Sequence, residues 1–292
     1  AWPAARDIFA AADEALGEAL SALCFEGPAD TLTLTHNAQP ALLAHGIAAW
    51  AVLRDELAPR GRAAAGHSLG EITAYCATGA LPLTDAVRLV RRRGTLMYEA
   101  GVARPGAMAA ILGDTIRPID DICADASASA EGGLAVAANY NSPGQIVISG
   151  EVAGVEKAME LAKQAGARRA VRLPVSGAFH SPLMTPARDA FGAALAAAPF
   201  VAPSVPVYSN VTAGPVTDAA HARRLLLEQL TAPVRWVQLV ERLTHDYPGA
   251  LFVELGPGSV LAGLVKKIAP SAECVSCGSA ADVDKVLNRV AA

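Results

Sequence analysis

The segment Gly66-His67-Ser68-Leu69-Gly70 constrains the fold more than any other part of the sequence. Its GxSxG spacing is that of a nucleophile elbow, in which a serine lies on a tight turn between a strand and a helix. The flanking residues predict that context, because residues 63–65 are typical of a weak strand and residues 69–77 of a helix. The amide of Leu69, at the start of this helix, can donate a hydrogen bond to an oxyanion. We therefore expect Ser68 to be a catalytic nucleophile. A purely structural tight turn is the alternative, since short matches with three fixed positions are common.

Helical and strand-like patterns alternate along the rest of the chain, which favours an α/β fold. We expect a large α/β-hydrolase-like core with a parallel sheet, formed by residues 1–104 and 175–292. Within residues 105–174 the strand-like and helical patterns predict an inserted small subdomain. Its elements follow the order βαββαβ, which is ferredoxin-like. Pro105-Gly106 and Pro174 are natural boundaries for it. The helices that we expect elsewhere cover residues 6–23, 39–57, 84–99, 182–197, 219–230, 234–245 and 260–268, and buried or short strands lie at 251–254 and near 207.

Composition limits the partners and the setting of the protein. The 24 basic and 28 acidic residues give a net charge of −4, too mild to indicate a nucleic-acid partner. Five cysteines, an odd number, argue against a disulfide scaffold and for a reducing, cytoplasmic setting. Cys274 and Cys277 form a CxxC pair, but there is no second pair, so we expect a strand end rather than a metal site. Neither a signal peptide nor a membrane-spanning segment is predicted.

A nucleophilic serine needs a base, and histidine is the usual one. The six candidates are His36, His45, His67, His180, His221 and His245. His67 adjoins Ser68 and is poorly placed, because successive side chains on a strand point to opposite faces. His180 lies in a loop between a strand and a helix, where α/β enzymes build their sites. His180 is therefore the candidate base, and a histidine in a helix-capping loop is the alternative.

Arg93 points along the buried face of its predicted helix. Its neighbours three and four positions away are all apolar: Leu89, Val90, Leu96 and Met97. A buried arginine needs an anionic partner, because an unpaired one costs several kcal/mol. The partner is either an internal carboxylate in a structural ion pair or the carboxylate of a substrate.

Five motifs in a fixed order carry a resemblance to a known family. They are GHSLGE at 66–71, RG at 93–94, NYNSPGQ at 139–145, FHS at 179–181 and GPG at 256–258. With these motifs the chain resembles malonyl-CoA:acyl carrier protein transacylases of type II fatty acid synthesis, over essentially its whole length. The acyltransferase domains of polyketide synthases are related to them.

The resemblance implies a ping-pong transferase that needs neither a cofactor nor a metal. It would move a malonyl group from malonyl-CoA to the phosphopantetheine thiol of acyl carrier protein, in fatty acid or polyketide biosynthesis. Ser68 would carry the malonyl group and His180 would act as general base and acid. Members of this family are commonly monomers, so the resemblance also implies that this protein is a monomer.

The same resemblance implies supporting roles for further residues. Leu69 would supply an oxyanion donor, and the main-chain carbonyl of Gln229 would orient the histidine in place of a triad carboxylate. Substrate-binding roles are implied for Arg93, Met97, Phe179, Gln39 and Asn141. In the related polyketide domains a phenylalanine beside the histidine accompanies malonyl preference, so Phe179 favours malonyl over methylmalonyl.

One part of the family pattern is not found in this sequence. The family opens with a strand and a Gly-Gln-Gly-Ser-Gln loop whose first glutamine gives a second oxyanion donor. The sequence begins after that point, at Ala1-Trp2-Pro3. A protein that truly lacked this loop would lose a central strand and one donor of the oxyanion hole, and losing one donor typically costs about 100- to 1,000-fold in rate.

Two other classes of function remain open. A serine hydrolase, such as a thioesterase or lipase, shares the elbow and uses the chain order Ser, acid, His. The insert between Ser68 and His180 argues against it, as does Arg93. A non-catalytic docking or scaffold domain is the third class.

Overall fold

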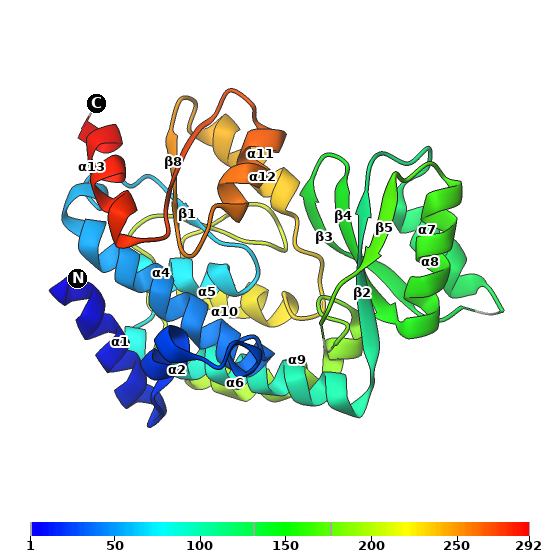
Figure 1. The fold of residues 1–292 in the computed structure, drawn as a ribbon, viewed down its shortest axis with the longest axis horizontal. Helices are drawn as coiled ribbons and strands as arrows, with labels where there is room; N and C mark the ends of the chain where they lie inside the picture. Colours follow the sequence, from blue (N-terminus) through cyan, green and yellow to red (C-terminus); the bar gives the residue numbers. More distant parts are fainter. Residues whose placement is uncertain (1, 131, 176, 292) are drawn as a thin grey trace.

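The computed structural model describes residues 2–130, 132–175 and 177–291. Its strands form a four-stranded, a three-stranded and a two-stranded sheet. Figure 1 shows the four-stranded sheet and its two helices at one end of the molecule, beside a larger body of helices around the two smaller sheets. We call these parts the small unit and the large unit.

The small unit follows the element order expected from the sequence. Its elements are β2 (Gly106–Leu112), α7 (Ile119–Ala128), β3 (Ala135–Ser142), β4 (Gln145–Glu151), α8 (Val152–Gln164) and β5 (Arg169–Arg172). The sheet order is β3-β4-β2-β5, and every pair is antiparallel. A core rich in alanine and isoleucine lies between the sheet and the helices. Helix α7 begins directly after Pro118.

The large unit is built mainly of helices that precede and follow the small unit in the sequence. The helices are α1 (Pro3–Leu16), α2 (Leu20–Glu26), α3 (Ala29–Leu32), α4 (Thr35–Leu57), α5 (Leu69–Ala77), α6 (Leu83–Ala103), α9 (Thr185–Ala197), α10 (Ala219–Glu228), α11 (Trp236–Asp246), α12 (Val260–Ile268) and α13 (Val283–Ala291), with short 3₁₀ turns η1 (Pro182–Met184) and η2 (Ala280–Asp282). The strands are β1 (Ala64–Ala65), β6 (Val207–Tyr208), β7 (Pro215–Val216), β8 (Leu251–Leu255) and β9 (Glu273–Cys277). No helix in the described ranges is long and apolar enough to cross a membrane.

The sheet of the large unit differs from the expected single parallel sheet. Strand β1 pairs with β6 in parallel, but β6 pairs with β7 antiparallel. A separate parallel pair, β8 and β9, stands apart from these three. Strand β1 is only two alanines long, and alanine lacks the branched or aromatic side chain that favours an extended strand.

Helix boundaries in the first third of the chain also correct the expectation. The helix expected at 6–23 is broken, because Gly17 adopts a left-handed conformation (φ 65°) that ends α1. Helix α4 begins at Thr35, four residues before the expected start at residue 39. Helix α6 begins at Leu83, directly after Pro82 and one residue before the expected start at residue 84.

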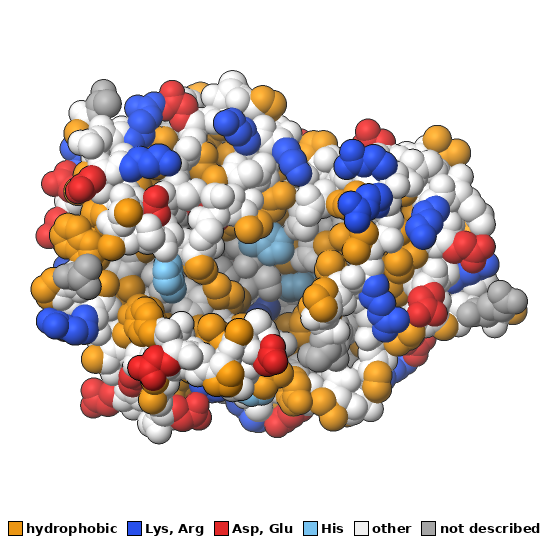
Figure 2. All heavy atoms as spheres, viewed as in Figure 1, with side chains coloured by type: hydrophobic (Ala, Val, Ile, Leu, Met, Phe, Trp, Pro, Cys, Tyr) orange, Lys and Arg blue, Asp and Glu red, His pale blue; other side chains and the backbone are white. Residues whose placement is uncertain are grey.

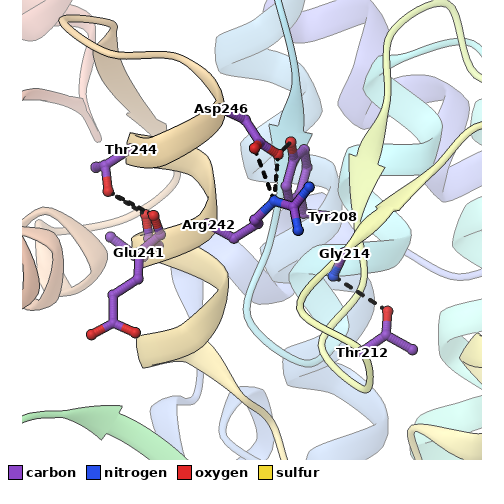
Figure 3. Close-up of polar contacts among 8 residues, drawn as sticks. Tyr208, Thr212, Gly214, Glu241, Arg242, Thr244 and Asp246 are labelled. Carbon is purple, nitrogen blue, oxygen red and sulfur yellow. Dashed lines mark hydrogen bonds and ion pairs between the residues drawn. The ribbon is translucent and has the colours of Figure 1, made fainter.

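Two connections hold the loops that carry the site. The Tyr208 hydroxyl at the end of β6 donates to Oδ2 of Asp246 (2.5 Å), which also accepts from Nε of Arg242 (2.7 Å; Figure 3). The main chain of Val234 bonds strand β3 of the small unit, donating to the Ala138 carbonyl (2.8 Å) and accepting from the Tyr140 amide (2.9 Å). The first contact fixes the segment that follows β6, and the second fixes the small unit against the large one.

Candidate active site

Ser68 lies on a strained turn between β1 and α5. Its φ of 52° and ψ of −109° are unusual for a residue with a side chain. The Ser68 amide donates to Oδ1 of Asn210 (2.6 Å), and Nδ2 of Asn210 donates to the Gly66 carbonyl (2.8 Å). One asparagine side chain thus holds both sides of the turn, and the strain projects the serine hydroxyl away from the helix.

Gly66 is required by a close approach of the backbone across this turn. A Cβ atom at position 66 would lie 2.0 Å from the carbonyl carbon and oxygen of Gly70. A Cβ atom at position 70 would meet nothing within 4 Å. Of the two glycines of the motif, only the first is fixed by sterics.

This asymmetry predicts opposite outcomes for two matched substitutions. Gly66→Ala should lower the free energy of unfolding by about 3 kcal/mol or more, because the turn must open to admit a methyl group. Gly70→Ala, within α5, should change it by no more than about 1 kcal/mol in either direction. Urea denaturation of both variants measures the difference. Equal losses in the two variants would contradict the steric account.

Ser68 and His180 form a hydrogen-bonded pair. Oγ of Ser68 lies 2.8 Å from Nε2 of His180, and Nδ1 of His180 lies 2.8 Å from the main-chain carbonyl of Gln229. A carbonyl only accepts, so Nδ1 carries the proton and Nε2 is free to accept the serine proton. His180 itself is 4% exposed and has a φ of 56°. The arrangement is that of a nucleophile and a base, with a carbonyl in place of the usual carboxylate.

The surroundings keep His180 neutral. Burial, and to a smaller extent the nearby charge of Arg93, lower the pKa of His180 to about 3, although the hydrogen bond to Gln229 acts in the opposite direction. A neutral imidazole is the form that can take a proton from a hydroxyl.

We predict that His180 stays unprotonated in the free protein from about pH 8 down to about pH 5, because a histidine is neutral above its pKa. Nitrogen chemical shifts of ¹⁵N-histidine-labelled protein measure this, and the His180→Ala variant assigns the signal. An imidazolium signal from His180 already at about pH 6 would contradict the prediction.

Arg93 lies against the serine with only neutral hydrogen-bond partners in the described part of the chain. It is 1% exposed and donates from Nη1 to Oε1 of Gln39 (2.7 Å). From Nη2 it donates to Oε1 of Gln229 (2.9 Å) and to Oγ of Ser68 (3.1 Å). Burial lowers the pKa of Arg93 to about 10, so the guanidinium remains charged near neutral pH. Its side chain therefore places a positive charge at the nucleophile that no directly bonded carboxylate neutralises.

The other predicted site residues lie in or beside this cluster. Met97 is buried, and its sulfur lies 3.5 Å from Nε2 of Gln39. Leu69 is the first residue of α5, where amides lack intrahelical partners. Oδ1 of Asn141 lies 2.8 Å from Nε2 of His67, so His67 is engaged by the small unit. Phe179 is half-buried against a small-unit cluster of Met108, Ala138 and Val147.

Two buried residues of the cluster were not predicted from the sequence. Glu71 and Asn210 are both 0% exposed, and the main-chain amide of Asn210 donates to Oε2 of Glu71 (3.0 Å). Glu71 does have a signal, because it is the only charged residue of an otherwise apolar helix, α5. Asn210 has none beyond following a short buried strand.

Part of the cluster reaches the surface of the molecule. Figure 2 shows a hollow in this face of the molecule, with histidine side chains in its floor. Ser68 and Phe179 are each partly exposed.

The CxxC pair lies elsewhere, on β9, and Cys277 is the last residue of that strand. All five cysteines are free thiols. Among the described residues no group of three or more histidine, cysteine or acidic side chains could hold a metal ion.

Known proteins with similar sequences and structures include several that are named for malonyl transfer. A family model described as acyl transferase domain matches residues 2–286. The malonyl CoA-acyl carrier protein transacylase of Bacillus subtilis strain 168 is 48% identical over 270 residues, which cover 91% of this chain and 83% of that protein. The crystal structure of an acyl-carrier-protein-S-malonyltransferase from Bartonella henselae matches with a TM-score of 0.93 and 43% identity, covering 100% of this chain and 92% of that one. A complex of a type II PKS acyl-carrier protein with its malonyl-transacylase matches with a TM-score of 0.90 and 38% identity, covering 99% and 92%.

Proposed function

The chain belongs to the acyl transferase domain family, and we infer that it transfers a malonyl group from malonyl-CoA to the phosphopantetheine thiol of an acyl carrier protein. The observation that carries this function is the contact between Nη2 of Arg93 and Oγ of Ser68 (3.1 Å). A buried cation with neutral partners beside a nucleophile suits an acyl group that ends in a carboxylate.

In the first half of the proposed reaction, Nε2 of His180 takes the proton of Ser68 as Oγ attacks the thioester carbon. The amide of Leu69, at the N-terminus of α5, donates to the oxyanion that forms. When the carbon–sulfur bond breaks, the proton on His180 passes to the CoA sulfur, and the malonyl group remains as an ester on Ser68. The Gln229 carbonyl keeps the imidazole oriented throughout, as its 2.8 Å contact with Nδ1 supports.

The second half repeats these steps with a different sulfur. His180 takes the proton of the carrier protein's thiol, and the thiolate attacks the malonyl ester. The ester bond breaks, Ser68 recovers its proton from His180, and malonyl-carrier protein leaves. Because one serine serves both halves, the kinetics are of the ping-pong type.

Arg93 selects the acyl group in this proposal. A malonyl carboxylate would pair directly with the guanidinium, whereas a neutral acyl chain would leave it with no directly bonded carboxylate, which favours malonyl over neutral acyl groups. Gln39, Met97, Phe179 and Asn141 are proposed to line the acyl pocket around it, supported by their positions in or beside the cluster.

We propose a monomer with an α/β-hydrolase-like subdomain, residues 1–104 and 175–292, and a ferredoxin-like one, residues 105–174. Residues 1, 131, 176 and 292 of these ranges lie outside the described residues. The antiparallel order β3-β4-β2-β5 supports the ferredoxin-like assignment. One chain supplies the serine, the histidine and the arginine, which supports the monomer. The free cysteines support a cytoplasmic setting.

A transfer assay tests the function against a serine hydrolase. The protein is mixed with malonyl-, methylmalonyl- or acetyl-CoA, with and without phosphopantetheinylated acyl carrier protein. We expect malonyl-carrier protein as the main product and little free malonate when the carrier is absent. Rapid release of malonate without the carrier would show a thioesterase instead.

A further inference from the structure

A fully buried carboxylate lies behind the proposed catalytic residues, and no step of the reaction above uses it. Glu71 is 0% exposed. Its Oε2 accepts hydrogen bonds from Nε2 of Gln229 (2.7 Å) and from the main-chain amide of Asn210 (3.0 Å). Its other oxygen, Oε1, has no hydrogen-bond partner among the described residues. Burying a carboxylate is costly, so a chain that keeps one here needs its charge or its hydrogen bonds.

Glu71 and Arg93 together determine which way the Gln229 amide points. An ionised carboxylate only accepts hydrogen bonds and a guanidinium only donates them. The side chain of Gln229 lies between the two, with Nε2 toward Glu71 and Oε1 toward Arg93 (2.9 Å). The reverse orientation would set two acceptors together on one side and two donors on the other. The amide therefore joins the two charged groups in a single arrangement.

Through two neighbours, Glu71 reaches each of the proposed functional groups. Gln229, which it holds by the side chain, also accepts from His180 through its main-chain carbonyl. Asn210, which it holds by the main-chain amide, accepts from the Ser68 amide through Oδ1 (2.6 Å). Loss of this carboxylate would loosen the supports of the nucleophile and of the base at once.

Charge gives Glu71 a second role. Burial raises the pKa of Glu71 to about 7, while the hydrogen bonds and Arg93 act in the opposite direction. Glu71 is therefore mostly ionised at pH 8. In turn its charge raises the pKa of Arg93 against the effect of burial. The two groups stabilise each other's charged forms across one amide.

We propose that Glu71 is a positioning residue of the transfer site, which orients Gln229 and Asn210 behind His180 and Ser68 and supplies the buried negative charge that balances Arg93. The proposal builds on the malonyl transfer proposed above. Glu71 also affects which acyl group is preferred, because the carboxylate of a bound malonyl group would share Arg93 with Glu71.

The first test compares Glu71→Gln with Glu99→Gln, a change at an exposed glutamate of α6, at pH 8. Glutamine can keep both accepted hydrogen bonds but loses the charge. Acetyl transfer from acetyl-CoA should fall about tenfold in Glu71→Gln, because hydrogen bonds to a neutral oxygen hold Gln229 and Asn210 less firmly than the charge-assisted bonds to the carboxylate. Malonyl transfer should fall less, because removing a like charge near the malonyl carboxylate favours its binding by about tenfold. The ratio of malonyl to acetyl kcat/KM should therefore rise, while Glu99→Gln leaves both unchanged.

Two results would overturn the proposal. Unchanged rates for both acyl groups in Glu71→Gln would show that the carboxylate is not needed. An equal fall for both, together with a lower melting temperature, would show a role in stability alone, because a smaller folded fraction reduces every activity by the same factor.

The second test needs no substrate, so it separates this proposal from the proposed function. Melting temperatures are measured at pH 8 for Glu71→Gln, Arg93→Gln and the double variant. Each single change leaves one buried charge unbalanced and should lower the melting temperature. The double variant should melt above the temperature expected from adding the two losses, even if one single variant folds poorly. Additive losses would overturn the charge pairing, whether or not the protein transfers malonyl groups.

Discussion

Replacement of Ser68 by alanine is expected to lower malonyl transfer by about 10⁴-fold or more, since the acyl group then has no atom to form an ester with. His180 and Arg93 both contact Oγ of Ser68, at 2.8 and 3.1 Å. Both would still be present in the variant, but neither can carry an acyl group through the two halves of the reaction. The measurement is the initial rate of malonyl-carrier protein formation at saturating malonyl-CoA.

Ser149→Ala is the matched control for this change, because Ser149 is a buried serine of β4 in the small unit. It should keep the wild-type rate to within about twofold, apart from any loss of folded protein. Transfer by Ser68→Ala at more than about one hundredth of the wild-type rate would show that another residue carries the acyl group.

Replacement of Arg93 by alanine is expected to change which acyl group is transferred. The guanidinium is buried and bonded only to neutral groups among the described residues, so a malonyl carboxylate would lose its charged partner in the variant. The ratio of malonyl to acetyl kcat/KM should fall by about 100-fold or more, because a site built to pair with a polar group discriminates strongly against its absence. Transfer rates with malonyl-CoA and acetyl-CoA, measured side by side, give this ratio.

Arg92→Ala serves as the control, since Arg92 neighbours Arg93 on α6 but is exposed. It should leave the ratio unchanged. Equal losses of malonyl and acetyl transfer in Arg93→Ala would contradict a role in acyl choice and would leave the arginine a structural role.

The local elements were largely predictable, because short-range patterns determine them. Helix α5 covers Leu69–Ala77 and α12 covers Val260–Ile268, as expected from apolar periodicity and flanking glycines. The order of elements in the small unit also agrees with the sequence. The break between α1 and α2 was missed, because the apolar pattern continues across Gly17 and only its left-handed conformation ends the helix.

Long-range pairing was less predictable. The two-residue strands β1 and β6 come from segments far apart in the chain, and nothing in their two alanines, valine and tyrosine specifies how many strands join them. The expectation of one parallel sheet was wrong for this reason.

Within the site, single residues were predictable but their partners were not. The apolar neighbours of Arg93 indicated its burial, which the structure confirms. The pattern could not show that its partners would be Gln39 and Gln229 rather than a carboxylate, because both lie on other helices or loops. Glu71 would not have been identified by the rule applied to Arg93, because two of its four neighbours three and four positions away are polar, His67 and Ser68.

The most direct test of the account is to locate the acyl group on the protein. The protein is mixed with malonyl-CoA without a carrier, digested and mapped by mass spectrometry, and a second sample then receives phosphopantetheinylated carrier protein. The account predicts one malonyl group per chain on the peptide containing Ser68, and its disappearance as malonyl-carrier protein forms. A malonyl group on any other residue, or none at all while malonyl-carrier protein accumulates, would contradict it.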